Sequence, residues 1–287
     1  MGGVAVVTDS TCDLPHELTE SLGIRVVPLS VAFGTESYIA GVTLDTAGFY
    51  QRLAQATRLP TTSQPAPAWF EEAYADAHDD GCEAVVSLHC SAELSGTVAL
   101  ARDRASAAPL PVEVVDTRLV GGALGLAALA AHRVASSGGS VAEVVAAAES
   151  VSRSQTSLIV VDTLDHLRRG GRLTGPQAAV GTALRVKPLL HLTDGRVEVR
   201  ERTRTWSRAL SRVGEIVADA AAGRRVDVVV VDAQARERAE LLWAQLDDRV
   251  AVRERLATPI GPIVGTHVGP GAVGVAVVPV EETSGAR

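Results

Sequence analysis

Short runs of aliphatic and β-branched residues alternate with helical patterns through the first half of the chain, and this alternation constrains the fold more than any other feature. Two helical segments, 13–23 and 65–81, each have proline near the start and glycine at the end. The apolar runs around them are 4–7, 26–31, 84–88 and 112–116. Strands and helices in this order form a parallel sheet with helices on both faces. Ligands of such sheets bind beyond the carboxyl ends of the strands.

The pattern changes near residue 155. Asp194 and Gly195 lie between two extended runs, which is a hairpin signal. Buried strands are expected within 224–233 and 271–280, and helices within 121–139 and 140–154, the second capped by Ser140. We therefore predict an α/β fold with two lobes: a parallel-sheet lobe over 1–155 and an α/β lobe with antiparallel strands over 156–287. The lobes are expected to share a large interface.

Composition excludes several classes of protein. The chain is 46% hydrophobic with a formal net charge of −7, so it can bury a large core and has no overall attraction to nucleic acid or anionic membrane. Three cysteines without CxxC spacing favour a reducing compartment and provide no metal site. The N-terminus does not resemble a signal peptide and no apolar run is long enough to span a bilayer. We expect a cytoplasmic protein with no transmembrane segment.

Polar residues gather where strands end or where proline and glycine set the backbone. Residues 8–11, Thr-Asp-Ser-Thr, follow the first strand, and their side-chain oxygens can cap the next helix or face a ligand. Thr62 and Ser63 lie between two prolines, which present their hydroxyls from a stiff segment. Either group is consistent with helix entry as well as with binding.

The segment HCSAELSGTVAL at 89–100 places hydroxyls on both sides of Gly96 directly after a buried strand. Glycine allows close approach of a ligand, and the start of a helix offers free N–H groups to an anion. The segment lacks the G-x-S-x-G spacing of a nucleophile elbow, and the chain has no P-loop motif. An anion cradle is therefore preferred over a catalytic serine. Its candidate residues are Ser91, Ser95, Gly96 and Thr97.

Two further groups are basic. His267 lies in the loop GTHVGPGAVG, whose glycines and proline indicate a special backbone conformation, and it can donate a hydrogen bond to an anion. Arginines cluster at 168–172 and again at 196–212, where six arginines accompany two glutamates. These clusters fit a solvated face, an acidic partner or a phosphoryl group. No histidine spacing indicates a metal site.

Taken in order, nine segments resemble the DegV family of bacterial fatty-acid-binding proteins. They extend over nearly the whole chain: VVTDSTCDLP (6–15), GIRVVPLSV (23–31), TSQPAP (62–67), LSGT (94–97), VVDT (114–117), TLDHLRRGGRLT (163–174), KPLL (187–190), DGRV (194–197) and THVGPGAVG (266–274).

The resemblance implies one DegV domain with a lipid tunnel between its two lobes. The ligand would be a long-chain fatty acid such as palmitate or oleate, with no other cofactor. The protein would carry no catalytic residue, and would present the acid's carboxyl group to a fatty-acid kinase subunit that forms acyl phosphate for phospholipid metabolism. The carboxylate would contact Thr62, Ser63, Ser91, Ser95, Gly96, Thr97 and His267, and the kinase would dock at Arg172, Arg202 and Arg204.

Two other functions are compatible with the residues. One is a serine-dependent acyl hydrolase that uses Ser91 or Ser95 with His89 or His267. The other is a regulatory module whose arginine-rich second lobe binds nucleic acid, which the net charge of −7 disfavours.

Overall fold

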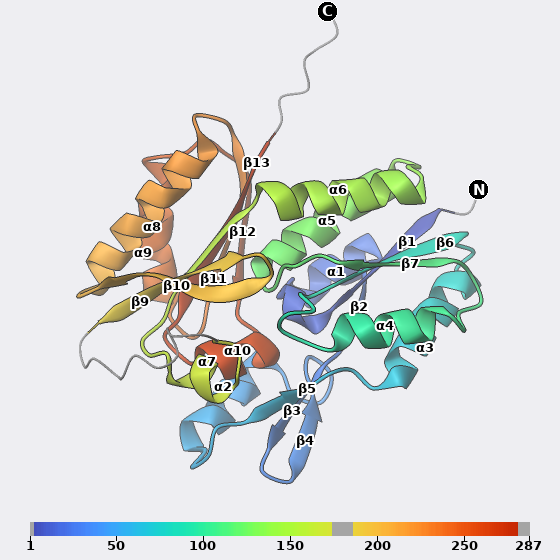
Figure 1. The fold of residues 1–287 in the computed structure, drawn as a ribbon, viewed down its shortest axis with the longest axis horizontal. Helices are drawn as coiled ribbons and strands as arrows, with labels where there is room; N and C mark the ends of the chain where they lie inside the picture. Colours follow the sequence, from blue (N-terminus) through green and yellow to red (C-terminus); the bar gives the residue numbers. More distant parts are fainter. Residues whose placement is uncertain (1–2, 174–185, 281–287) are drawn as a thin grey trace, which may run out of the picture.

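A computed structural model describes residues 3–173 and 186–280, and its first layer is the predicted parallel sheet (Figure 1). The strand order is β2-β1-β6-β7, and all neighbours are parallel. The sheet consists of β1 (Val4–Asp9), β2 (Arg25–Val27), β6 (Ala84–His89) and β7 (Val112–Asp116). The run predicted at 26–31 is divided, because Pro28 has no N–H for the ladder and β3 starts a different sheet at Ser30.

Helices cover both faces of this sheet, as predicted from the alternation. Side chains alternate along a strand, so Val7 packs with Phe70 on one face and Val6 packs with the small residues of α5 on the other. The first face carries α3 (Pro67–Asp79) and α4 (Thr97–Ala105), and the second carries α5 (Gly122–Ser136) and α6 (Val141–Ser154). Helix α1 (His16–Leu22) connects β1 to β2. Ser140 caps α6 in a capping box with Glu143, as expected.

A six-stranded sheet forms the second layer, with strand order β10-β9-β8-β13-β11-β12. Its neighbours are antiparallel except for β11 and β12. Asp194 and Gly195 form the β9–β10 turn with φ values of 49° and 78°, which confirms the predicted hairpin. The strands are β8 (Thr156–Val160), β9 (Lys187–Thr193), β10 (Arg196–Thr203), β11 (Val226–Asp232), β12 (Val252–Pro259) and β13 (Val273–Pro279).

Helix α5 lies between the two sheets, which places it at the centre of the molecule (Figure 1). A Cβ on Gly122 would lie 2.4 Å from Cγ1 of Val229, so only glycine lets the helix approach the second sheet this closely. The far face of the second sheet is covered by α8 (Trp206–Ala221) and α9 (Arg236–Asp247). The parallel sheet falls within the predicted lobe 1–155 and the second sheet within 156–287. The boundary itself stays a prediction.

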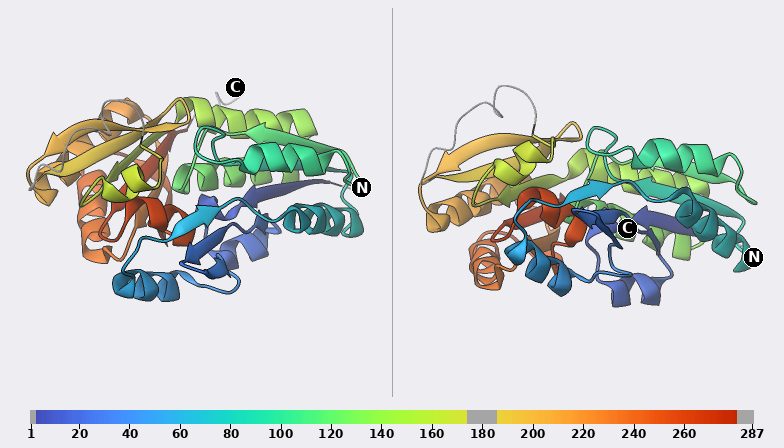
Figure 2. Two further views of the ribbon diagram at one scale, coloured as in Figure 1. Left: turned by 60° about the horizontal axis from the view of Figure 1, so that its bottom comes forward. Right: turned by 90° about the horizontal axis from the view of Figure 1, so that it is seen from below.

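A small antiparallel sheet of order β4-β3-β5 and a group of short helices complete the fold (Figure 2). Helix α10 contacts β3, β5, α2, α7 and the 3-10 helix η1, so it joins segments from both halves of the chain. These elements are η1 (Ser10–Cys12), β3 (Ser30–Phe33), β4 (Glu36–Ile39), α2 (Thr46–Gln55), β5 (Thr61–Ser63), α7 (Asp165–Arg169) and α10 (Pro262–Val268). Within the described ranges, no helix has the length and apolar character needed to cross a bilayer.

Candidate functional site

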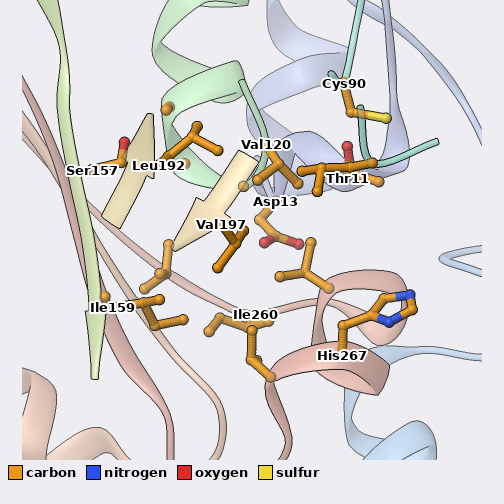
Figure 3. A pocket seen from close by; sticks show the side chains of 18 of the residues that line it. Thr11, Asp13, Cys90, Val120, Ser157, Ile159, Leu192, Val197, Ile260 and His267 are labelled. Atoms are coloured by element: carbon orange, nitrogen blue, oxygen red, sulfur yellow. The ribbon is translucent and has the colours of Figure 1, made fainter. Parts of the chain in front are cut away.

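An apolar cavity lies between α5, the inner face of the second sheet and α10 (Figure 3). Its atom-free space, open solvent at the mouth included, is about 1020 Å³. Thr11 and Val120 from the first half of the chain line it, and so do Ile159 and Ile260 from the second half. The cavity therefore lies between the two sheet layers, where the predicted fold has its tunnel.

One end of the cavity is polar and consists of Thr62, Ser95, Arg172 and His267, which we call the polar end. Thr62 Oγ1 and His267 Nε2 are 2.9 Å apart in a hydrogen bond. The Arg172 Nε donates to the carbonyl oxygen of Leu94 at 3.1 Å, and its Nη1 donates to the carbonyl oxygen of Gly170 at 2.5 Å. The polar end thus combines two hydroxyls, an imidazole and a guanidinium at the limit of a mostly apolar space.

Close backbone contacts bring these motifs together. A Cβ on Gly96 would lie 2.6 Å from Oε1 of Gln64, so the LSGT and TSQP segments adjoin. A Cβ on Gly170 would lie 2.3 Å from Nδ1 of His267, so the RRGG turn adjoins α10. Because Thr62 also bonds His267, the four segments LSGT, TSQP, RRGG and α10 are neighbours in space.

His267 is neutral at physiological pH in this environment. Burial, followed by the positive charge of Arg172 and the proximity of His166, lowers the pKa of His267 to about 4. Its Nδ1 is buried and has no hydrogen-bond partner within the part of the chain that the structure describes. A neutral imidazole can donate from one ring nitrogen, so His267 can offer one hydrogen bond to an anion without adding a charge.

A second polar network lies below the cavity, at the end of β1. His89 Nδ1 is 3.1 Å from Asp9 Oδ2, and His89 Nε2 is 2.7 Å from Ser87 Oγ. Asp9 also accepts hydrogen bonds from the backbone N–H of Thr11 and of Cys90, two residues that line the cavity. Burial by itself raises the pKa of Asp9, but the bonds and charge of His89 and the bonds from Thr11 and Cys90 outweigh it and hold the pKa below its usual range.

This Asp-His-Ser chain has the order of a catalytic triad but no access to substrate. Asp9, Ser87 and His89 are each 0% exposed, and none of the three lines the cavity. The hydrolase alternative pairs Ser91 or Ser95 with His89 or His267. Among the described residues, His89 instead bonds Ser87 and Asp9, and His267 bonds Thr62. The geometry does not provide the serine–histidine contact that the alternative needs.

The other predicted contact residues lie around the polar end rather than in the cavity wall. Ser63 is exposed, Gly96 is the exposed N-cap of α4, and Thr97 is buried with its Oγ1 2.8 Å from Ser95 Oγ. Ser91 is fully buried against the β9–β10 turn, because a Cβ on Gly195 would lie 2.4 Å from Ser91 Oγ. Whether these four residues contact a ligand stays a prediction.

The predicted docking arginines separate into two kinds. Arg172 lines the cavity and is half-buried, so its guanidinium belongs to the polar end. Arg202 and Arg204 are exposed at the end of β10 and just beyond it. Neither forms an ion pair with another described residue.

Asp13 is a cavity residue that the sequence analysis missed. It lines the cavity and is 7% exposed, and its Oδ1 accepts a hydrogen bond from the Gly261 N–H at 2.9 Å. Burial, partly opposed by that bond and assisted by the charge of Asp9, raises the pKa of Asp13 to about 7. Its position before Leu14 indicated only the start of a helix. Its burial depends on Gly261, which is 248 residues away.

These features define a class of protein: an α/β fold of two sheet layers that encloses one apolar cavity with a polar end. The family model described as "Uncharacterised protein, DegV family" matches residues 3–280. The chain belongs to the DegV family.

Individual relatives extend over the whole chain. A DegV domain-containing protein of Streptomyces coelicolor is 46% identical over 275 residues, which cover 96% of this chain and 98% of the relative. A solved structure described as fatty acid binding of a DegV family protein from Thermus thermophilus has a TM-score of 0.91 at 34% identity, covering 97% of this chain and 100% of that one. The structure of DegV from Bacillus subtilis, described as a fatty acid binding protein, has a TM-score of 0.87 at 32% identity, with coverage of 98% and 100%.

Proposed function

We propose that this protein binds one long-chain fatty acid, with the hydrocarbon tail in the cavity and the carboxyl group at the polar end. The observation that carries the proposal is the cavity itself, which is lined mostly by aliphatic side chains and has Thr62, Ser95, Arg172 and His267 at one end. The descriptions of the Thermus and Bacillus structures as fatty-acid-binding proteins support the same ligand class.

The two parts of the site have different energetic roles. Burial of a methylene contributes about 0.8 kcal/mol, so a sixteen-carbon tail offers about 12 kcal/mol before ordering costs. A buried carboxylate without partners is costly, and the hydroxyls, the imidazole and the guanidinium can satisfy it. The tail therefore provides affinity, and the polar end sets the orientation of the acid in the cavity.

Binding is tested by native mass spectrometry and by palmitate titration of delipidated protein. We expect one fatty acid per chain, and His267→Ala should weaken palmitate binding about tenfold, as expected for loss of one hydrogen bond to a charged group. His78→Ala is the matched control, because His78 is exposed on α3. Ligand-free protein that takes up neither palmitate nor oleate would overturn the proposal.

The role in the cell that we propose is that of a carrier in the cytoplasm. The protein would present the carboxyl group to a fatty-acid kinase subunit for phosphorylation to acyl phosphate, and would itself perform no chemistry. Two observations support this role: the carboxyl site lies at one end of the cavity, and Arg202 and Arg204 are exposed without ion pairs among the described residues. Exposed arginines suit an acidic docking surface.

Reconstitution with a fatty-acid kinase catalytic subunit and ATP tests the carrier role. Arg202→Ala together with Arg204→Ala should slow acyl phosphate formation at least tenfold and leave palmitate affinity unchanged. Arg236→Ala, on the exposed side of α9, serves as the control. Equal rates for the double variant and the wild type would exclude these two arginines from docking. Labelling of Ser91 or Ser95 by a fluorophosphonate would instead favour the hydrolase.

A further inference from the structure

Asp13 is held in place by contacts with the second half of the chain. It is the residue after η1 and has left-handed backbone angles of φ 51° and ψ 25°. Its carbonyl oxygen accepts a hydrogen bond from Thr258 Oγ1 at 2.7 Å, and its Oδ1 accepts one from the Gly261 N–H at 2.9 Å. These bonds fix the carboxyl group, so its second oxygen cannot turn towards another partner without breaking the bond to Gly261.

The second oxygen is unpaired in a residue that lines the cavity. Oδ2 of Asp13 is buried and has no hydrogen-bond partner among the described residues. Figure 3 shows the carboxyl group between Val120, Val197 and Ile260, on the path from His267 to Ser157. A tail that starts at the polar end and fills the cavity therefore passes this oxygen.

The charges around Asp13 do not stabilise its ionised form. None of the ion pairs among the described residues includes Asp13, and the nearest charge is the carboxylate of Asp9, which is also negative. The thiol of Cys12 and the hydroxyl of Tyr50 also lie near Asp13, and both are neutral because burial raises their pKa values. Asp232 lies near Tyr50. Across the cavity the titratable groups are His191, Arg172 and His267.

We propose that loading of the cavity with an acyl chain is coupled to uptake of one proton by Asp13, so that the protein binds the tail most tightly when Asp13 is a neutral carboxylic acid. The inference rests on the proposed function, because it requires a hydrocarbon tail in the cavity. The coupling follows from position: solvent in the cavity is the polar medium next to the buried carboxyl group, and a tail replaces it with hydrocarbon, which stabilises a carboxylate less and offers no hydrogen bond.

The sign and size of the effect follow from linkage. Burial already raises the pKa of Asp13 to about 7 in the empty protein, and removal of solvent by the tail raises it further. A group whose pKa is higher in the bound state weakens binding as pH rises through the pKa of the free state. If the bound pKa lies at or above about 8, palmitate affinity falls about five- to tenfold between pH 6 and pH 8.

The experiment measures palmitate dissociation constants at pH 6, 7 and 8 for the wild type and for Asp13→Asn. The amide oxygen can keep the bond to Gly261 but the side chain cannot ionise. We expect the wild type to lose five- to tenfold more affinity than Asp13→Asn over this range. Because both proteins meet the same ligand, ionisation of the palmitate carboxyl cancels in the comparison. Asp116→Asn is the matched control, since Asp116 also accepts backbone N–H bonds but lies outside the cavity wall.

A second measurement covers the case in which Asp13→Asn does not fold. Titration calorimetry of the wild type at pH 7.5 in two buffers of different ionisation enthalpy counts the protons taken up on binding. Uptake of more than half a proton per palmitate supports the inference. Binding without proton uptake, or equal pH profiles for the wild type and Asp13→Asn, overturns it and leaves fatty-acid binding intact. Failure to bind palmitate at every pH overturns the proposed function instead.

Discussion

If the proposed function holds, one substitution at the far end of the cavity should shorten the acyl chain that it accepts. Ala276 lines the cavity, is 4% exposed and pairs with Ser157 across β13 and β8. Figure 3 shows Ser157 on the opposite side of the cavity from His267, so this strand pair faces the terminal methyl group of a tail that begins at the polar end. Ala276→Leu adds three carbons to the wall at this point.

The expected loss can be worked out from the tail. Three added carbons exclude about three methylenes of a sixteen-carbon chain, at about 0.8 kcal/mol each. The loss is therefore about 2.4 kcal/mol, or about 50-fold in the dissociation constant of palmitate. Laurate is four carbons shorter and should lose little, because its tail ends before the new side chain.

The assay compares dissociation constants for palmitate and laurate in the wild type and in Ala276→Leu. The measured quantity is the ratio of the palmitate to the laurate dissociation constant within each protein, since this ratio is insensitive to a general loss of active protein. Ala73→Leu, a partly buried helix position packed in the opposite core, controls for the added bulk. An unchanged ratio in a folded Ala276→Leu variant would show that the tail does not run from the polar end towards Ser157.

Three further outcomes are expected. Asp9→Ala should lower the free energy of unfolding in urea at pH 7 by about 3–5 kcal/mol, because it removes a buried carboxylate from its bonds with His89. Because the pKa of Asp9 is held low, its contribution is full above about pH 4 and is lost as pH falls through the folded pKa, so the difference from wild type should shrink in acid. Gly122→Val should prevent close packing of α5 on Val229 and yield protein of low thermal stability by calorimetry. Ser140→Ala should cost about 1 kcal/mol in the same urea titration through loss of the α6 cap, and a smaller cost than the Asp9 change distinguishes a surface cap from a buried network.

Local patterns in the sequence were sufficient for most of the fold. The parallel strands and their helices, the Asp194-Gly195 hairpin and the Ser140 cap all lie where the sequence places them. Each depends on residues within a few positions of one another, because turns, caps and alternation are short-range effects. The exception at Pro28 is also local, since the missing N–H ends β2.

The family resemblance predicts which segments contribute to the site, but not which hydrogen bonds each side chain forms there. Thr62 and His267 were both candidates, and they form one hydrogen bond at the polar end. The guanidinium of Arg172, a predicted docking residue, bonds the carbonyls of Leu94 and Gly170 at the cavity wall, and its role in docking stays a prediction. A motif shows which residues are near one another, whereas side-chain direction depends on the packing around them.

The sequence by itself determined the order of strands and helices, the small residues that let α5 fit between two sheets, and the order of the nine motifs. Tertiary structure alone decided the chemistry of the acids. Asp9 meets His89 from 80 residues away and keeps a low pKa, while the carboxyl group of Asp13 has one hydrogen bond among the described residues, from Gly261, 248 residues away, and has a raised pKa. The two carboxyls lie four positions apart in the sequence, at the two ends of η1, and they differ because burial and pairing depend on long-range contacts that no local pattern contains.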